Sequence, residues 1–313
     1  MLKRSISPMW RANLKAPNRQ LRIRCCFVSK ASIASFKVKK KGFHTRMVFN
    51  NHSFEIAPQG NRLAYRCDGA PEEVGPCGLF WLGGFMSDMM GSKAESLAEL
   101  ARNTRRGILR FDYSGHGQSQ GLFVDGTISL WLEQATHMFL KLTRNRRIII
   151  GSSMGGWLAL LLAKRLQQED PVAFRRIGGM VLIAPATDMT RDLMWNQFSS
   201  DVQQALMEKG IYHQPSNYGN PYPITLRLIE DGENHILLPK GLTLPFPVRI
   251  LQGTEDSEVP PAHAFKTLEG LLGADVTLSL IKGGDHRLSS PSQLRLIREA
   301  TLALAERVDG NVV

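Results

Sequence analysis

The pentapeptide GSSMG, residues 151–155, carries the clearest chemical signal in the sequence. It follows the apolar run RRIII and precedes the helix-forming run MGGWLALLLAKRL, so we expect a tight turn between a strand and a helix. G-x-S-x-G turns of this kind project the central hydroxyl group above the end of the strand, where it can act as a nucleophile. The two outer glycines identify Ser153 as that nucleophile and Ser152 as its neighbour.

A serine hydroxyl group needs a base to take its proton, and histidine is the usual one. Where a nucleophile stands on such a turn, the acid and then the histidine follow it along the chain. The histidines after Ser153 are His213, His235, His263 and His286. His286 lies in the glycine-rich segment IKGGDHRLS, directly after the strand-like run VTLSLI. We therefore predict that His286 is the base.

The imidazole must be oriented by a carboxylate, and Asp256 is the predicted acid. It lies in LQGTEDSEVP, just after the strand-like run PVRIL and thirty residues before His286. The alternatives are Glu255, Glu258 and Asp188. Asp285, which is adjacent to the histidine, is interpreted as a solvated turn residue, and His116, which precedes the nucleophile, as a structural loop histidine.

Acyl transfer places negative charge on a carbonyl oxygen, which main-chain N–H groups can stabilise. One N–H is expected from Met154, the residue after the nucleophile, and the other from Phe85, after the apolar run GLFWLGG at 78–84. The side chains of Phe85, Met86 and Met154 could form the floor of an acyl pocket or pack in the core.

Short apolar runs alternate with amphipathic stretches throughout residues 51–313. The expected strands are 78–84, 107–113, 146–151, 178–186, 247–253 and 276–281, after an antiparallel pair formed by HSFEI and RLAYRCD. The expected helices are 92–103, 128–142, 154–168, 261–272 and 291–308. This alternation predicts one α/β domain with a mostly parallel sheet, whose ligands bind beyond the carboxyl ends of the strands. Residues 187–245 interrupt it with aromatic residues, prolines and no clean strand, and we interpret them as a lid insertion over that edge.

The positive charge is concentrated at the N-terminus. Of the 39 Lys and Arg residues, 13 lie in residues 1–50, which contain no Asp or Glu; residues 51–313 hold 26 against 28 acidic residues. A basic nucleic-acid groove through the body is therefore not expected. No apolar run approaches the ~18–20 residues of a membrane helix. The four cysteines form no CxxC pair, so a disulfide framework or zinc site is not expected.

The acid-free segment 1–50 has the composition of a mitochondrial transit peptide and lacks the apolar centre of a secretory signal. A disordered basic tail is one alternative. Translation from Met47 is another, and an RNA-binding arm with salt-dependent affinity is a third. The expected location is the mitochondrial matrix for a eukaryotic source or the cytoplasm for a bacterial one, without secretion.

The order GGF … FDYSGHGQSQG … GSSMGGW … GTEDSEVP … GGDHR resembles the α/β-hydrolase superfamily. More narrowly, it resembles the mitochondrial palmitoyl-protein thioesterase subgroup, whose members also hydrolyse acyl glucuronides, and its proteobacterial relatives. The resemblance covers residues 52–308. Two residues differ from those that many members of the superfamily have. Gly83 and Gln252 stand where many members have histidine, and neither is expected to touch the catalytic residues.

The resemblance implies a mostly parallel eight-stranded sheet flanked by helices, with a small lid. It implies a serine hydrolase of acyl thioesters or carboxylic esters, with Ser153, Asp256 and His286 as catalytic residues and oxyanion contacts at Phe85 and Met154. No metal or organic cofactor is implied, and the substrate could be an S-acylated protein. A small-ester or lactone hydrolase and a non-catalytic ligand-binding protein are the alternatives, and the oligomeric state is open.

Overall fold

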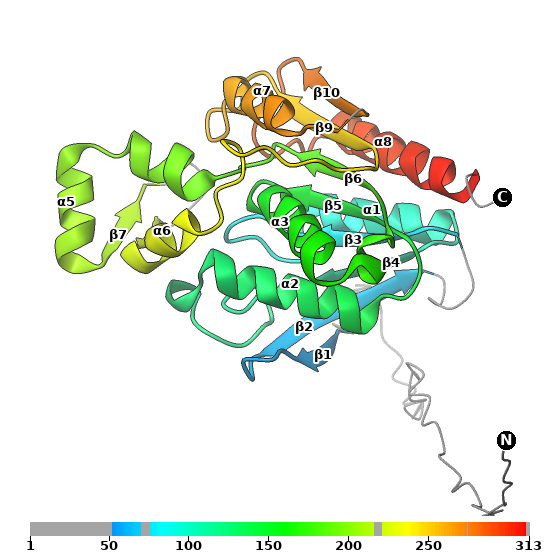
Figure 1. The fold of residues 1–313 in the computed structure, drawn as a ribbon, viewed down its shortest axis with the longest axis horizontal. Coiled ribbons are helices and arrows are strands. Elements are labelled where there is room, and N and C mark those ends of the chain that lie inside the picture. The colour runs from blue at the N-terminus through cyan, green and yellow to red at the C-terminus, as the bar shows by residue number, and fades with distance from the viewer. Residues whose placement is uncertain (1–51, 70–75, 216–220, 274, 311–313) are drawn as a thin grey trace, which may run out of the picture. The chain divides into compact units, whose positions relative to one another are not determined.

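Eight strands form one mostly parallel sheet in the computed structural model, which describes residues 52–69, 76–215, 221–273 and 275–310 (Figure 1). In spatial order they are β1 (Ser53–Ile56), β2 (Arg62–Gly69), β4 (Gly107–Phe111), β3 (Gly78–Leu82), β5 (Arg147–Ser152), β6 (Ile177–Ile183), β9 (Val248–Gly253) and β10 (Val276–Ile281). β2 is antiparallel to both of its neighbours, and the other pairs are parallel. The predicted fold class is therefore confirmed.

The central strands are apolar because both faces of the sheet are covered. Every residue of β3, β5 and β6 is buried, which is typical of strands in parallel sheets. The strand register aligns the segments that follow these strands. Leu82 at the end of β3 pairs with Gly151 in β5, and Gly253 at the end of β9 pairs with Ile281 at the end of β10. The loops carrying the predicted site residues therefore start side by side at one edge.

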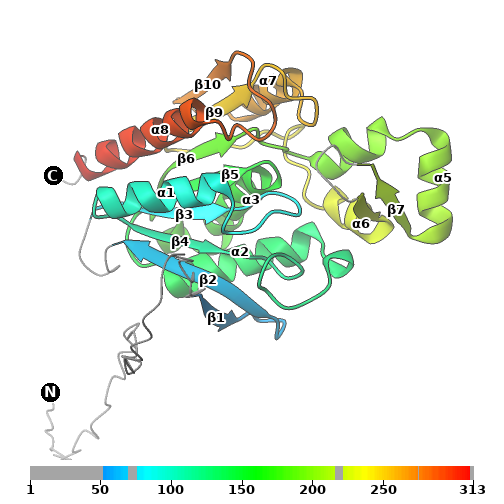
Figure 2. The same cartoon turned by 180° about the vertical axis from the view of Figure 1, so that it is seen from behind.

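Helices cover the two faces of the sheet separately (Figures 1 and 2). One face packs against α1 (Ser92–Asn103) and α8 (Pro291–Gly310), and the other against α2 (Ile128–Leu142), α3 (Met154–Glu169) and α7 (Pro261–Gly270). The short elements η1 (Phe123–Asp125) and α4 (Pro171–Phe174) lie in connections. The N-cap residue of α2 is Thr127, whose hydroxyl oxygen accepts the Leu130 N–H and so satisfies a donor that the helix leaves unpaired.

The segment between β6 and β9 has more regular structure than the sequence suggested. It contains η2 (Thr190–Met194), η3 (Trp195–Gln197), α5 (Ser200–Lys209), β7 (Ile211–Gln214), β8 (Tyr222–Thr225) and α6 (Leu226–Glu233). The expectation of no clean strand here was wrong, because β7 and β8 form an antiparallel pair. Each is only four residues long, and β8 contains Pro223, which argues against a strand in a sequence-based assignment.

The N-terminal interpretations lie outside the described residues, as do the alternative start at Met47 and the cysteines Cys25 and Cys26. Within the described ranges, Cys67 and Cys77 form no disulfide. None of the helices in those ranges combines the length and the apolar character that crossing a membrane requires.

Candidate active site

Ser153 occupies a strained turn between β5 and α3. Its backbone angles are φ 54° and ψ −121°, a conformation that a residue with a side chain rarely adopts. Two glycines allow the turn. A Cβ at Gly151 would collide with the carbonyl oxygen of Gly155, and a Cβ at Gly155 would collide with that of Leu82. Although Ser153 is the N-cap residue of α3, its side chain makes no capping hydrogen bond, so the hydroxyl group remains available for other contacts.

The hydroxyl group of Ser153 faces the imidazole of His286, which in turn faces the carboxylate of Asp256. Ser153 Oγ lies 3.1 Å from His286 Nε2, and His286 Nδ1 lies 2.9 Å from Asp256 Oδ2. Because the carboxylate can only accept, Nδ1 donates its hydrogen to Asp256 and the Nε2 lone pair faces the serine. The structure thus brings together the three residues that were predicted to form the site, from segments 30 and 133 residues apart.

Asp256 is held by main-chain and side-chain donors after β9. Its Oδ1 accepts the N–H groups of Glu258 at 3.0 Å and Val259 at 2.8 Å. Its Oδ2 accepts the side-chain amide of Gln252 at 3.0 Å in addition to the imidazole. The expectation that Gln252 would not touch the predicted catalytic residues was therefore wrong. The available signal was an amide near the buried end of the strand VRILQG, since buried polar side chains are normally hydrogen-bonded.

A second carboxylate lies on the serine side of the imidazole. Of the two rival glutamates, Glu258 is the one that approaches His286, with Oε2 3.8 Å from Nε2. Its side chain is 33% exposed, whereas that of Asp256 is fully buried. Asp256 therefore has the position of an orienting acid, and Glu258 contributes negative charge beside the reacting atoms.

The remaining candidate acids have partners elsewhere. The carboxylate of Asp188 accepts the N–H groups of Leu237 at 2.8 Å and Leu238 at 2.9 Å, and burial raises its pKa. Asp188 therefore joins the start of the insertion to residues near its end. Asp285 accepts the N–H of Leu288 at 3.0 Å, as a turn residue does.

The other histidines after Ser153 make contacts away from it. His235 Nε2 lies 2.7 Å from the hydroxyl oxygen of Ser129, and His263 Nε2 lies 2.7 Å from the carbonyl oxygen of Thr187. His213 lies in β7. Burial lowers the pKa of His235 and of His263. The imidazole that faces Ser153 is therefore that of His286.

The two N–H groups expected to bind an oxyanion are unpaired among the described residues. The Met154 N–H belongs to the first residue of α3, where a helix provides no acceptor, and the Phe85 N–H has no acceptor in that part of the chain. A Cβ at Gly84 would lie 3.3 Å from the Cβ of Ser153. The turn that carries Phe85 therefore passes directly beside the serine.

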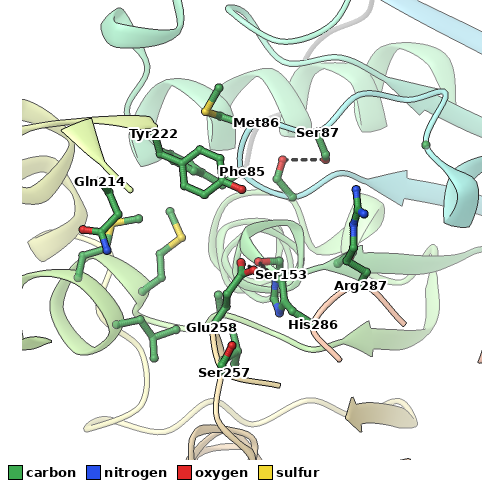
Figure 3. A pocket seen from close by; sticks show the side chains of 18 of the residues that line it. Phe85, Met86, Ser87, Ser153, Gln214, Tyr222, Ser257, Glu258, His286 and Arg287 are labelled. Carbon is green, nitrogen blue, oxygen red and sulfur yellow. Dashed lines mark hydrogen bonds and ion pairs between the residues drawn. The ribbon is translucent and has the colours of Figure 1, made fainter. Parts of the chain in front are cut away.

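A cavity of about 1230 Å³ opens beside Ser153 and His286 (Figure 3). Phe85 and Tyr222 lie across it from the serine, and Glu258 lies next to His286. The apolar part of the lining comes mainly from the insertion and from the loop after β3: Phe85, Met86, Met189, Leu193, Met194, Phe198, Tyr222 and Ile224. The cavity therefore offers apolar surface on one side of the serine.

The other side of the cavity carries cations. Lys93, at the start of α1, and Arg287, next to the imidazole, both line it. The Lys93 ammonium donates a hydrogen bond to the carbonyl oxygen of Arg287, and burial lowers its pKa to about 8. Lys93 thus joins the start of α1 to the loop that carries His286. Sequence reasoning missed both residues, because α1 and the His286 loop are separated by almost two hundred positions.

Comparisons with known proteins agree on the family. The sequence profile of the α/β hydrolase family matches residues 78–294. The chain is 30% identical over 222 residues to the human protein named palmitoyl-protein thioesterase ABHD10, mitochondrial, and the match covers 70% of each chain.

Solved structures show the same similarity in three dimensions. A crystal structure from Agrobacterium vitis, of a protein described as a hydrolase, superimposes with a TM-score of 0.78 at 39% identity, over 81% of this chain and 98% of that one. Mouse α/β hydrolase domain-containing protein 10 superimposes with a TM-score of 0.73 at 26% identity, over 82% of this chain and 99% of the mouse chain.

Proposed function

The chain belongs to the α/β hydrolase family, and from this we propose that it is a serine hydrolase that cleaves acyl thioesters or carboxylic esters through an acyl-enzyme. The observation that carries the proposal is the hydrogen-bond chain from Ser153 Oγ through the His286 imidazole to Asp256. An unperturbed serine hydroxyl group is a weak nucleophile, and this chain supplies the base that activates it.

The proposed reaction has two acyl-transfer steps. His286 Nε2 takes the proton of Ser153 as Oγ attacks the acyl carbonyl carbon, and then gives that proton to the leaving thiol or alcohol as the acyl–leaving-group bond breaks. Water attacks the acyl-enzyme by the same route and releases the acid. The Phe85 and Met154 N–H groups stabilise the oxyanion in both steps, and Asp256 holds the imidazole in the required tautomer and stabilises it when protonated.

The lining of the cavity supports an acyl substrate of some length. The apolar side chains contributed by the insertion (residues 187–245) and by the loop after β3 provide a surface on which an alkyl chain loses contact with water. The similarity to a protein named palmitoyl-protein thioesterase points to the same substrate class. We therefore propose that the insertion acts as a lid that binds the acyl chain, and that an S-acylated protein is a candidate substrate.

A chain-length series tests this proposal. Thioesters of one thiol, from acetyl to palmitoyl, should be turned over with kcat/KM rising with chain length. His286→Ala should lower kcat on the order of 10⁴-fold, while Ser292→Ala, an exposed serine in α8, should leave it unchanged. Leu193→Trp, which fills the apolar part of the cavity, should shift the preference to short chains. No turnover of any ester or thioester, or full activity in His286→Ala, would contradict the proposal.

The N-terminal segment is proposed to direct the protein to mitochondria. Residues 1–50 contain 13 basic and no acidic residues, and the human relative is named mitochondrial. Such segments are removed on import, so the mass of the native protein should correspond to a chain that starts well after residue 1. A native mass that includes residue 1 would contradict this assignment.

A further inference from the structure

We infer that His116 is a positioning residue for the oxyanion site: its Nε2 accepts the Met86 N–H and thereby fixes the turn that carries the Phe85 N–H. This inference rests on the proposed function and gives a role to the motif SGHGQSQG, which the catalytic residues do not use. Met86 N lies 3.3 Å from His116 Nε2, across 30 residues of sequence. Phe85 precedes Met86 directly, so the bond constrains the peptide next to the proposed oxyanion donor.

The turn that carries Phe85 needs such a constraint. Met86 has a φ of 54°, in the left-handed region that costs free energy for a residue with a side chain and persists only where the surroundings enforce it. On its other side the turn is closed by Ser87, whose N–H and hydroxyl group donate to the Gly84 carbonyl oxygen at 3.2 and 2.9 Å. The turn is therefore closed from within by the bonds between Ser87 and Gly84. It is held from outside by the bond between Met86 and His116.

The hydrogen bonds of His116 determine which nitrogen can accept. Its Nδ1 lies 3.2 Å from the carbonyl oxygen of Ser114. A carbonyl oxygen only accepts, so Nδ1 carries the hydrogen and Nε2 presents the lone pair that Met86 requires. Burial lowers the pKa of His116 to about 4, so this arrangement is maintained through neutral pH.

The ring itself has no freedom to turn away. His116 is 4% exposed, and three aromatic rings pack against it edge-on, with centroids 5.1–5.5 Å away: Tyr113, Phe123 and Trp131. The indole N–H of Trp131 also donates to Ser114 O, the same oxygen that His116 uses. A rigid acceptor can hold a strained turn, whereas a mobile one would relax with it.

A second contact joins the same two loops. The carboxylate of Asp112 accepts the N–H of Met89 at 2.7 Å and that of Gln118 at 2.8 Å. Asp112 thus attaches the far end of the Phe85 loop to the His116 loop. His116 acts at the end nearest Ser153, which is why its removal should affect the chemical step more than the binding of substrate.

The test compares His116→Phe, which keeps an aromatic ring but has no acceptor, with His116→Gln, whose terminal amide oxygen can take the place of Nε2. His263→Phe is the matched control, because His263 is equally buried and bonded to a main-chain carbonyl group away from Phe85. Loss of an oxyanion donor typically costs about 10²–10³-fold in kcat, so for a misplaced donor we expect a loss of about 10- to 100-fold in His116→Phe. KM should change less than about threefold, and His116→Gln should recover part of kcat.

Inhibitor binding separates this role from general loosening of the fold. A long-chain trifluoromethyl ketone, which forms an oxyanion on the serine, should bind His116→Phe more weakly by the same factor as kcat falls. An unreactive thioether analogue should bind as it does to the wild type. Wild-type kcat in His116→Phe, or equal weakening of both inhibitors, would overturn the inference. If His116→Phe does not fold, His116→Gln and His116→Met provide the same comparison. An inactive wild-type protein would instead contradict the proposed function.

Discussion

The side-chain amide of Gln252 lies 3.0 Å from Asp256 Oδ2, the carboxylate oxygen that also faces His286. The same amide group donates to the carbonyl oxygen of Val259 at 2.9 Å. Gln252 therefore links the end of β9 to the loop that carries the acid, and its amide and the imidazole share the same carboxylate oxygen.

Gln252→Met should impair both activity and stability. Methionine keeps the length of the side chain but has no donor, so the buried carboxylate and the Val259 carbonyl group each lose a partner. We expect a decrease in the free energy of unfolding of about 1–3 kcal/mol, the usual cost of leaving a buried polar group unsatisfied, and a three- to thirty-fold decrease in kcat. Urea unfolding and steady-state kinetics measure the two effects. Gln204→Met, on the exposed side of α5, is the control; if Gln252→Met matched it, the amide would have no role in the site.

The contrast between Ser153 and Gln252 illustrates what the sequence could predict. The first lies in a motif whose strand, turn and helix are all visible in neighbouring residues. His286 and Asp256 follow apolar strands, and parallel strands end at one edge, so their convergence could also be expected. The contact of Gln252 with Asp256 depends on how the acid loop folds back over β9, which no local pattern encodes.

Contacts between loops were even harder to predict from the sequence. The bond between His116 and Met86 joins two turns whose positions are set by the order of β4, β3 and β5 in the sheet. The strands β7 and β8 were missed because both are short and β8 contains Pro223, which argues against a strand.

The identity of the acid can be tested with two substitutions. Asp256→Asn should lower kcat by about 10³–10⁴-fold, because an amide in contact with Nδ1 favours the wrong tautomer of the imidazole. Asp188→Asn should reduce stability by weakening the bonds to Leu237 and Leu238, with kcat changed less than about threefold. Kinetics with one thioester substrate and thermal unfolding of both variants provide the measurement. The reverse pattern would identify Asp188 as the acid.

Glu258 should influence which leaving groups are accepted. Its carboxylate lies 3.8 Å from the nitrogen that protonates the leaving group, so it should repel a leaving thiol that carries a carboxylate of its own. Because Glu258 is partly exposed, solvent reduces this repulsion to about 1 kcal/mol. Glu258→Gln should therefore raise kcat/KM about fivefold for the octanoyl thioester of 3-mercaptopropionate, relative to that of the neutral N-acetylcysteamine. The gain should shrink at 1 M salt. Equal changes in kcat/KM for both thioesters would show that Glu258 does not discriminate between charged and neutral leaving groups.

Burial of His116 should make stability depend on pH. Its pKa is lowered from 6.5 in the unfolded chain to about 4 in the folded protein. Between these values the unfolded state binds more protons, so stability is fully present above pH 6.5 and is lost as the pH falls towards 4. The contribution is at most about 3 kcal/mol, in addition to those of His235 and His263, whose pKa values are also lowered.

Urea unfolding at pH 7 and pH 5 measures this dependence. His116→Gln should lose less stability between the two pH values than the wild type does, whatever its stability at pH 7. An equal loss in both proteins would mean that His116 titrates in the folded protein as it does in the unfolded chain.

The most direct test of the account is the reaction of Ser153 with a fluorophosphonate. This reagent modifies serines that a neighbouring base activates, and intact-mass measurement counts the adducts. We expect a single adduct on the wild-type protein, located on the peptide that contains Ser153, and none on Ser153→Ala. No adduct on folded wild-type protein, or an adduct that persists in Ser153→Ala, would contradict the assignment of Ser153 as the nucleophile.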